Sequence, residues 1–139
     1  MYISISPRRE KKEKTVHELS KTAEDYLEVM YVLEKQYGRI RIKDIADRLG
    51  VRPSSVIEYL KRLDNEGLVS YKPGSRARLT DKGKRLAEKI YKRHEIIKEF
   101  LILLGVPDDI ADKDACYIEH GIHPITLEKV IEFIKRIRK

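Results

Sequence analysis

Apolar residues recur at helical spacing in the first patterned stretch of the chain, residues 21–38. The apolar stripe of this stretch comprises Tyr26, Leu27, Met30, Tyr31 and Leu33. Residues three and four apart share one face of an α-helix, so the stripe predicts an amphipathic helix that ends at Gly38. Thr22 is the expected N-cap, because Asp25 follows it three residues later as in a capping box.

The next stretch predicts two short helices joined at a corner. The apolar positions of the first helix are Ile42, Ile45, Ala46 and Leu49, and those of the second are Val56, Leu60 and Leu63. Gly50 stands where a helix commonly ends, Val51 is expected to plug the turn, and Pro53 suits the first turn of the second helix. Two short helices with a glycine at their corner form a helix-turn-helix.

Residues 68–79 follow with the pattern of a β-hairpin. Its strand-like residues are Leu68, Val69, Tyr71 and Ala77 to Leu79, with a turn signal at Pro73 and Gly74. A hairpin directly after a helix-turn-helix is the winged-helix arrangement.

Beyond residue 80 the pattern is helical again. We expect a long helix that ends at Gly105, a shorter helix over residues 108–120, and a last helix from about Pro124. Their apolar residues are Leu86, Ile90, Ile97, Leu101 and Leu104 on the long helix, and Ile125, Val130, Phe133, Ile134 and Ile137 on the last one. His94 falls inside the stripe of the long helix.

These elements predict a mostly α-helical fold, with an N-terminal winged helix-turn-helix domain followed by an all-helical domain. We expect a flexible arm over residues 1–20, a winged-helix domain over 21–84 and a helical domain over 85–139. No apolar run approaches the roughly 20 residues of a membrane span, and the N-terminus does not resemble a secretory signal. A single cysteine cannot form an internal disulfide, so a cytoplasmic protein is expected.

The net charge of +7 is concentrated in one third of the chain. Residues 38–85 hold 13 Lys and Arg against 6 Asp and Glu, a surplus of 13 − 6 = 7, and the remainder is neutral. A local basic surplus indicates a polyanion, and a helix that can enter the major groove favours duplex DNA. The candidate DNA-binding residues are Arg52, Pro53, Ser54, Ser55, Glu58, Tyr59, Lys61, Arg62, Lys72, Arg76 and Arg78. A solvated basic surface is the alternative.

Three separate stretches offer side chains that can hold a divalent cation. These side chains are Asp25 and Glu28 on the first helix, His94 on the long helix, and Cys116, Glu119 and His120 on the helix that follows. Each set has a simpler explanation: carboxylates favour a helix N-terminus, a histidine in an apolar stripe is often a core residue, and a lone cysteine is often buried. Sequence alone does not show that the three helices converge.

The chain resembles the diphtheria toxin repressor family of metal-dependent transcriptional regulators, and its short manganese-sensing branch most of all. The matching motifs are "TAEDYLEVMYVLE", "IADRLGVRPSSVIEYLKRLDNEGLV", "LTDKGKRLAEKIYKRHEIIKEFL" and "ACYIEH". The resemblance implies a repressor that binds a DNA operator as a homodimer through its C-terminal helices, with no SH3-like domain. It also implies that the six residues above are metal ligands.

The implied ligand set is a hybrid of two branches of that family. Cys116 stands where the manganese branch has glutamate and the iron branch has cysteine, whereas Asp25 stands where the iron branch has methionine. We therefore expect Mn²⁺ or Fe²⁺ as the cofactor, with Zn²⁺ and Co²⁺ as alternatives. The ancillary site of the iron branch is poorly preserved, because Lys98 replaces a carboxylate and Asp112 replaces a histidine.

Other functions fit the sequence less well. A winged-helix regulator that answers an organic ligand, or none, is the main alternative. A metallohydrolase with Glu119 as its base would need a second catalytic motif, which the sequence lacks. A structural zinc module would need more cysteines. We therefore do not expect an enzyme.

Overall fold

The computed structural model describes residues 19–74 and 76–139. In that part of the chain the elements are α1 (Lys21–Tyr37), α2 (Ile42–Leu49), α3 (Pro53–Asn65), β1 (Val69–Ser70), β2 (Arg78–Leu79), α4 (Asp81–Leu103), α5 (Asp108–Glu119) and α6 (Pro124–Ile137). The predicted fold class and order of elements are confirmed. Residues 1–18 of the expected arm lie outside the described residues, but Leu19 is buried in the core.

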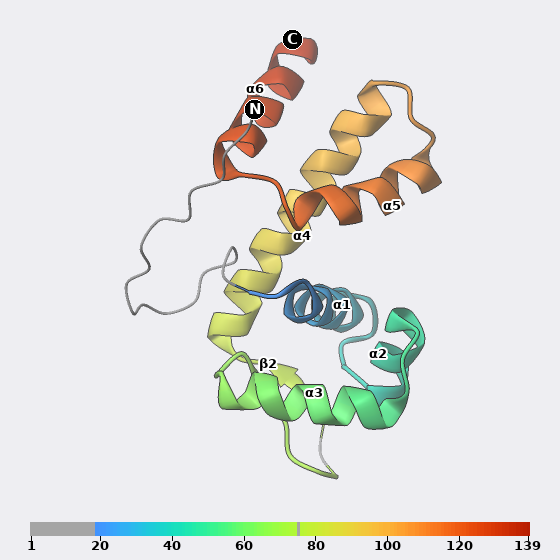
Figure 1. Ribbon diagram of the computed structural model, residues 1–139, viewed down its shortest axis with the longest axis vertical. Helices are drawn as coiled ribbons and strands as arrows, with labels where there is room; N and C mark the ends of the chain where they lie inside the picture. The colour runs from blue at the N-terminus through green and yellow to red at the C-terminus, as the bar shows by residue number, and fades with distance from the viewer. Residues whose placement is uncertain (1–18, 75) are drawn as a thin grey trace, which may run out of the picture.

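Helix α4 connects the two ends of the molecule (Figure 1). Its first turns lie beside the small sheet, its middle packs against α1, and its last turns contact α5 and α6. The helix runs without interruption through residues 84 and 85, where the two domains are expected to meet. Any change in how α4 sits against α1 therefore alters the placement of the DNA-binding half relative to α5 and α6.

Two local predictions in the N-terminal half are wrong. Helix α1 is capped by Ser20, whose Oγ accepts a hydrogen bond from the backbone N–H of Ala23 at 3.1 Å, and Thr22 lies inside the helix. Val51 does not plug the turn between α2 and α3, because its side chain is exposed. The turn is made instead by Gly50, whose φ of 67° is a left-handed conformation that glycine adopts without steric cost.

The base of the hairpin is fixed to the start of α4. Strands β1 and β2 pair antiparallel, with Val69 opposite Leu79, over two residues each, which is shorter than expected. The backbone N–H of Thr80 donates to the carbonyl of Leu68 at 3.1 Å. A Cβ at Gly83 would lie 1.9 Å from that same carbonyl oxygen. Only glycine therefore allows α4 to begin so close to the sheet.

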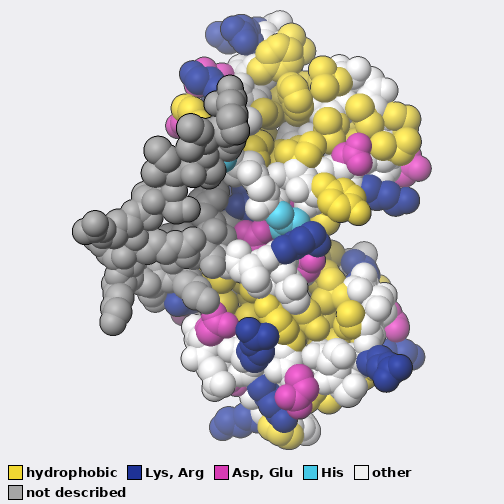
Figure 2. All heavy atoms as spheres, in the orientation of Figure 1, with side chains coloured by type: hydrophobic (Ala, Val, Ile, Leu, Met, Phe, Trp, Pro, Cys, Tyr) yellow, Lys and Arg dark blue, Asp and Glu magenta, His cyan; other side chains and the backbone are white. Residues whose placement is uncertain are grey.

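The apolar core is concentrated in the N-terminal half. Its buried residues run from Leu19 to Ile90 and include Leu60 and Leu63 of α3. In contrast, α5, α6 and the end of α4 leave large apolar side chains on the surface (Figure 2). None of the described helices is long and apolar enough to cross a membrane.

Candidate functional site

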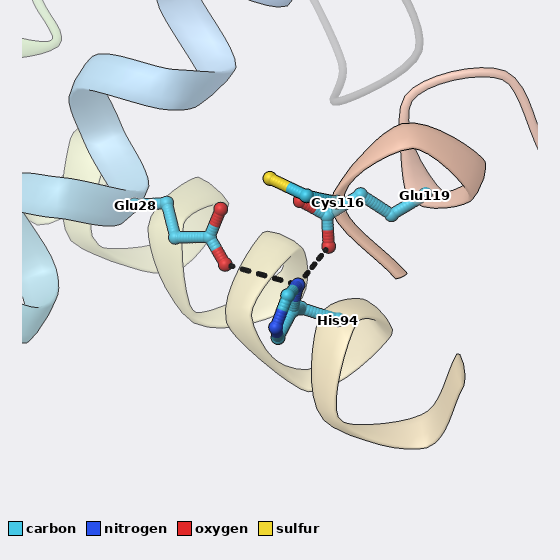
Figure 3. Close-up of side chains that lie close together, drawn as sticks. All are labelled: Glu28, His94, Cys116 and Glu119. Carbon is cyan, nitrogen blue, oxygen red and sulfur yellow. Dashed lines mark ion pairs between the residues drawn. The ribbon is translucent and has the colours of Figure 1, made fainter. Parts of the chain in front are cut away.

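Three helices bring four ligand-type side chains together (Figure 3). Glu28 comes from α1, His94 from α4, and Cys116 and Glu119 from α5. The Nδ1 atom of His94 lies 3.2 Å from Oε2 of Glu119 and 3.9 Å from Oε2 of Glu28. One ligand atom from each residue lies within 4.8 Å of the others. Opposite ligands of one transition-metal ion are about 4–4.6 Å apart, so the group has the dimensions of an ion site.

A second group adjoins the first and shares Cys116 with it. Its other members are Asp25 and His120, again with ligand atoms within 4.8 Å of one another. The Nε2 atom of His120 lies 3.0 Å from Oδ1 of Asp25 and 3.6 Å from Oε1 of Glu119. All six residues expected to bind metal therefore fall into two neighbouring groups.

Local helix geometry explains this convergence. Asp25 and Glu28 are three residues apart on α1, and Cys116 and Glu119 have the same spacing on α5, so each pair shares one helix face. His120 is the C-cap residue directly after α5, one turn beyond Cys116.

Several buried atoms in these groups lack a hydrogen-bond partner among the described residues. They are both carboxylate oxygens of Glu119, Nδ1 of His94 and Nε2 of His120. Glu119 is fully buried, and an ionised carboxylate there is costly unless a cation compensates it. Buried oxygen and nitrogen atoms that face one another without hydrogen bonds are suited to a divalent cation, and the residues present fit such a group.

Electrostatics in the metal-free chain favour bound protons at this site. Contact with Glu119 raises the pKa of His94 to about 10. Contact with Asp25, followed by Cys116, raises the pKa of His120 to about 11. Burial and the nearby charge of Glu119 raise the pKa of Glu28 to about 8. At neutral pH, His94, His120 and Glu28 therefore hold bound protons. A metal ion at this site would displace those protons.

The residues expected to bind DNA lie on one helix and the hairpin. Those on α3 and at its start that are exposed are Arg52, Pro53, Ser54, Ser55, Glu58, Lys61 and Arg62, and those on the hairpin are Lys72, Arg76 and Arg78. Tyr59 differs, because it is half-buried and its ring stacks on Tyr26 of α1 with centroids 4.5 Å apart. Its hydroxyl also lies 3.2 Å from Oγ of Ser20, so Tyr59 joins α3 to the start of α1.

The structure adds Arg39 to this basic surface. Arg39 follows α1 and lines a hollow of about 330 Å³ together with Arg76 and Arg78. The sequence places Arg39 in the basic third of the chain, but its position between two predicted helices gave no reason to single it out.

Two family models match the chain in succession. The first, the iron-dependent repressor N-terminal DNA-binding domain, matches residues 18–77, and the second, the metal-binding and dimerisation domain of the same family, matches residues 80–139. The chain belongs to the iron-dependent repressor family. The resemblance stated from the sequence motifs is thereby confirmed.

Individual relatives of this repressor agree with the family match. An uncharacterised HTH-type transcriptional regulator of Methanocaldococcus jannaschii is 35% identical over 122 residues, which cover 86% of this chain and 98% of the relative. The HTH-type transcriptional regulator MntR of Bacillus subtilis is 32% identical over 112 residues, covering 81% and 79% of the two chains.

Two solved structures show the same architecture. The manganese regulator SloR has a TM-score of 0.71 at 32% identity, and the IdeR protein of T. acidophilum has a TM-score of 0.72 at 28% identity. Each match covers 81% of this chain and 53% of the other chain, so the repressor spans about half the length of these two structures.

Two residues at the site carry no prediction from the sequence, Glu24 and Arg93. Both are buried, and Nη2 of Arg93 donates to Oε2 of Glu24 at 3.1 Å. The other oxygen of Glu24 forms a short hydrogen bond with Nδ1 of His120. A signal existed: Glu24 is three residues from Leu27, and Arg93 is three residues from Ile90, so each charge lies within an apolar stripe. A charged residue at a buried position usually has a specific partner.

Proposed function

We propose that this family member is a metal-dependent DNA-binding transcriptional repressor that responds to Mn²⁺ or Fe²⁺ and controls genes of metal homeostasis. The observation that carries this proposal is the meeting of ligand-type groups from α1, α4 and α5 around buried atoms without hydrogen bonds. We assign the metal-ligand roles to Asp25, Glu28, His94, Cys116, Glu119 and His120.

Helix α1 connects this site to the DNA-binding half. It supplies Asp25 and Glu28 on one face, and Tyr26 on another face stacks on Tyr59 of α3. A bound divalent cation supplies positive charge that draws the carboxylates of α1 and α5 together. Holding α1 against α4 and α5 then fixes α3 relative to the C-terminal helices.

A homodimer makes this coupling effective on DNA. We assign the dimer contact to the C-terminal helices, whose exposed apolar residues include Leu104, Ile118, Ile125 and Ile137. Two recognition helices of such a dimer must lie about 34 Å apart, one turn of DNA, to enter successive major grooves. A bound metal would therefore favour dimers with that spacing, by no more than its difference in affinity for the two arrangements of the helices.

The mixed ligand set bears on which metal acts in the cell. Carboxylates favour hard ions such as Mn²⁺, whereas the thiolate of Cys116 favours Fe²⁺, Co²⁺ or Zn²⁺. Cys116 is the one member of both groups, and it is half-buried. Replacing Cys116 with Glu would make the set all oxygen and nitrogen, and we expect that variant to prefer Mn²⁺ more strongly than the parent does.

The decisive experiment is a DNA mobility shift on fragments selected from a random pool. The wild-type chain is assayed with Mn²⁺, Fe²⁺, Zn²⁺ and a chelator, beside Glu119→Ala and the control Asp109→Ala, an exposed carboxylate of α5 outside both groups. We expect metal to raise the DNA affinity of the wild type and the control about 5- to 150-fold and to leave Glu119→Ala unchanged. An equal response in Glu119→Ala, or none in the wild type, contradicts the proposal.

A further inference from the structure

The two histidines of the candidate metal site are held in the same way, by residues that belong to neither ligand group. We infer that Asp112 and Glu24 are positioning residues, which bind the outer ring nitrogen of His94 and His120 so that the inner nitrogen faces the metal. This inference rests on the proposed metal-binding function and deepens it, because it assigns the tautomer of each histidine and two supporting carboxylates.

His94 shows the arrangement most simply. Its Nε2 atom lies 2.8 Å from Oδ1 of Asp112, which is a hydrogen bond. Its Nδ1 atom is buried, has no hydrogen-bond partner among the described residues, and faces Glu119 and Glu28. A neutral imidazole carries one N–H, so donation from Nε2 to Asp112 leaves the lone pair on Nδ1, pointing into the ligand group.

His120 shows the same arrangement with the nitrogens exchanged. Its Nδ1 atom is hydrogen-bonded to Oε1 of Glu24. Its Nε2 atom is buried without a hydrogen-bond partner among the described residues and faces Asp25 and Glu119. Donation from Nδ1 to Glu24 therefore leaves the lone pair on Nε2, so the two histidines bind the metal through opposite nitrogens.

Each supporting carboxylate is itself paired with a cation. Arg93 holds the second oxygen of Glu24 at 3.1 Å, and both side chains are buried. Lys98 lies 3.5 Å from Oδ1 of Asp112. A carboxylate oxygen beside a cation is placed to accept a hydrogen bond, so the outer nitrogen of each histidine is placed to donate its N–H. Lys98, which departs from the family pattern at the ancillary site, therefore pairs with the carboxylate that supports His94.

The two supports differ in exposure, which makes one of them safe to test by mutation. The Asp112 side chain is 54% exposed, and without it His94 still contacts Glu119 and Lys98 still pairs with Asp108. Loss of Glu24 would leave the buried guanidinium of Arg93 unpaired. The role of Glu24 is therefore tested without mutation, by locating the proton of His120 in the wild-type protein. Asp109, exposed on the same helix and outside both groups, is the matched control.

The experiment combines histidine ¹⁵N NMR with calorimetry, and uses Zn²⁺ because it is diamagnetic. In the Zn²⁺-loaded wild type we expect a proton on Nε2 of His94 and on Nδ1 of His120. We expect Asp112→Ala to weaken Zn²⁺ binding about 10- to 100-fold, Asp112→Asn to lose less because it keeps an acceptor oxygen, and Asp109→Ala to bind as the wild type does.

The outcomes separate this inference from the proposed function. Zn²⁺ bound to either histidine through the outer nitrogen overturns the inference, as does an affinity of Asp112→Ala equal to that of Asp109→Ala. Either result leaves the metal response of DNA binding intact. A wild-type chain that binds neither Zn²⁺ nor Mn²⁺ overturns both the inference and the proposed function.

Discussion

The two halves of this repressor treat their apolar residues in opposite ways. In the N-terminal half, Leu60 and Leu63 of α3 and Ile45 of α2 are fully buried in a continuous core. In the C-terminal half, Ile125 and Ile137 of α6 are 58% and 53% exposed. The first half buries most of its apolar side chains within one chain, whereas the second leaves many of them exposed, in the region that matches the dimerisation domain of the family.

The basic surplus of the sequence lies in the N-terminal half, within residues 38–85. Exposed cations such as Arg52 and Arg76 lie on the DNA-binding half, where their charge favours the approach of a polyanion such as DNA. The candidate metal site lies between the halves and contains residues of both, since α1 belongs to one and α5 to the other. With the proposed function, DNA recognition, metal sensing and dimerisation would occupy successive zones along α4.

The largest effect should come from removing a core side chain in the N-terminal half. Leu60→Ala is expected to lower the free energy of unfolding by about 2–5 kcal/mol, because it leaves a cavity in a closed core. Ile125→Ala, at low protein concentration where chains are monomeric, should cost less than about 0.5 kcal/mol. Urea denaturation monitored by circular dichroism measures both. Similar losses in the two variants would remove the contrast between the halves.

The next effect concerns association. The double variant Ile125→Glu and Ile137→Glu is expected to weaken the dimer by about 2 kcal/mol or more, because it places charge on an apolar contact. Light scattering after size exclusion should then show monomers at concentrations where the wild type is dimeric. A control, Lys129→Glu on the same helix, tests whether added negative charge alone is responsible. A double variant that stays dimeric would mean that α6 does not form the contact.

The sequence predicts the helices and their apolar faces correctly, because these depend on local spacing. It does not predict which other element or chain covers each apolar face. The spacing of Val56, Leu60 and Leu63 predicts α3 and its buried face, and both are observed. The same spacing on α6 predicts an apolar face, but only Ile134 of its apolar residues is buried within the chain. An apolar stripe indicates which face of a helix is covered, but it does not identify the element or chain that covers it.

The site shows the same limit in polar residues. The i, i+3 pairs on α1 and α5 and the histidine in the apolar stripe of α4 are visible in the sequence, but their convergence is not. Glu24 and Arg93 were missed because their partner lies 69 residues away, and only the packing of α1 against α4 brings them together. The predicted N-cap of α1 was wrong for a simpler reason. Ser20 and Thr22 are both good N-cap residues, and the choice between them depends on where Leu19 enters the core.

The dependence of stability and metal affinity on pH tests the candidate metal site between the halves. We expect this effect to be smaller than the two above. The pKa of His94 is raised to about 10 and that of His120 to about 11, so the metal-free folded chain binds more protons than the unfolded chain. Its stability is therefore fully present below about pH 6.5 and falls as the pH rises toward 10. Metal binding displaces these protons, so its apparent affinity should rise about tenfold per pH unit, or about 1.4 kcal/mol, for each proton released.

Two measurements check this prediction. The melting temperature of the metal-free chain should fall between pH 6.5 and 9, whereas that of the Mn²⁺-loaded chain should change less. Calorimetry of Mn²⁺ binding in buffers of different ionisation enthalpy should show proton release at pH 7. In His120→Ala we expect the melting temperature of the metal-free chain to depend less on pH, because the variant lacks one of the protonated groups. Metal binding that is independent of pH would contradict the protonated state of the cluster.

The smallest effect concerns the hairpin, where the comparison between the halves predicts a purely electrostatic role. Arg76 is exposed beside Arg39 and Arg78, and we expect it to contact a phosphate. Arg76→Ala should weaken binding to all DNA sequences by a similar factor and reduce the slope of log affinity against log salt by about 1. Lys129→Ala, which removes a cation from the association half, should leave both unchanged. Because a phosphate contact carries no sequence information, a loss confined to the preferred operator would instead make Arg76 a reader of bases.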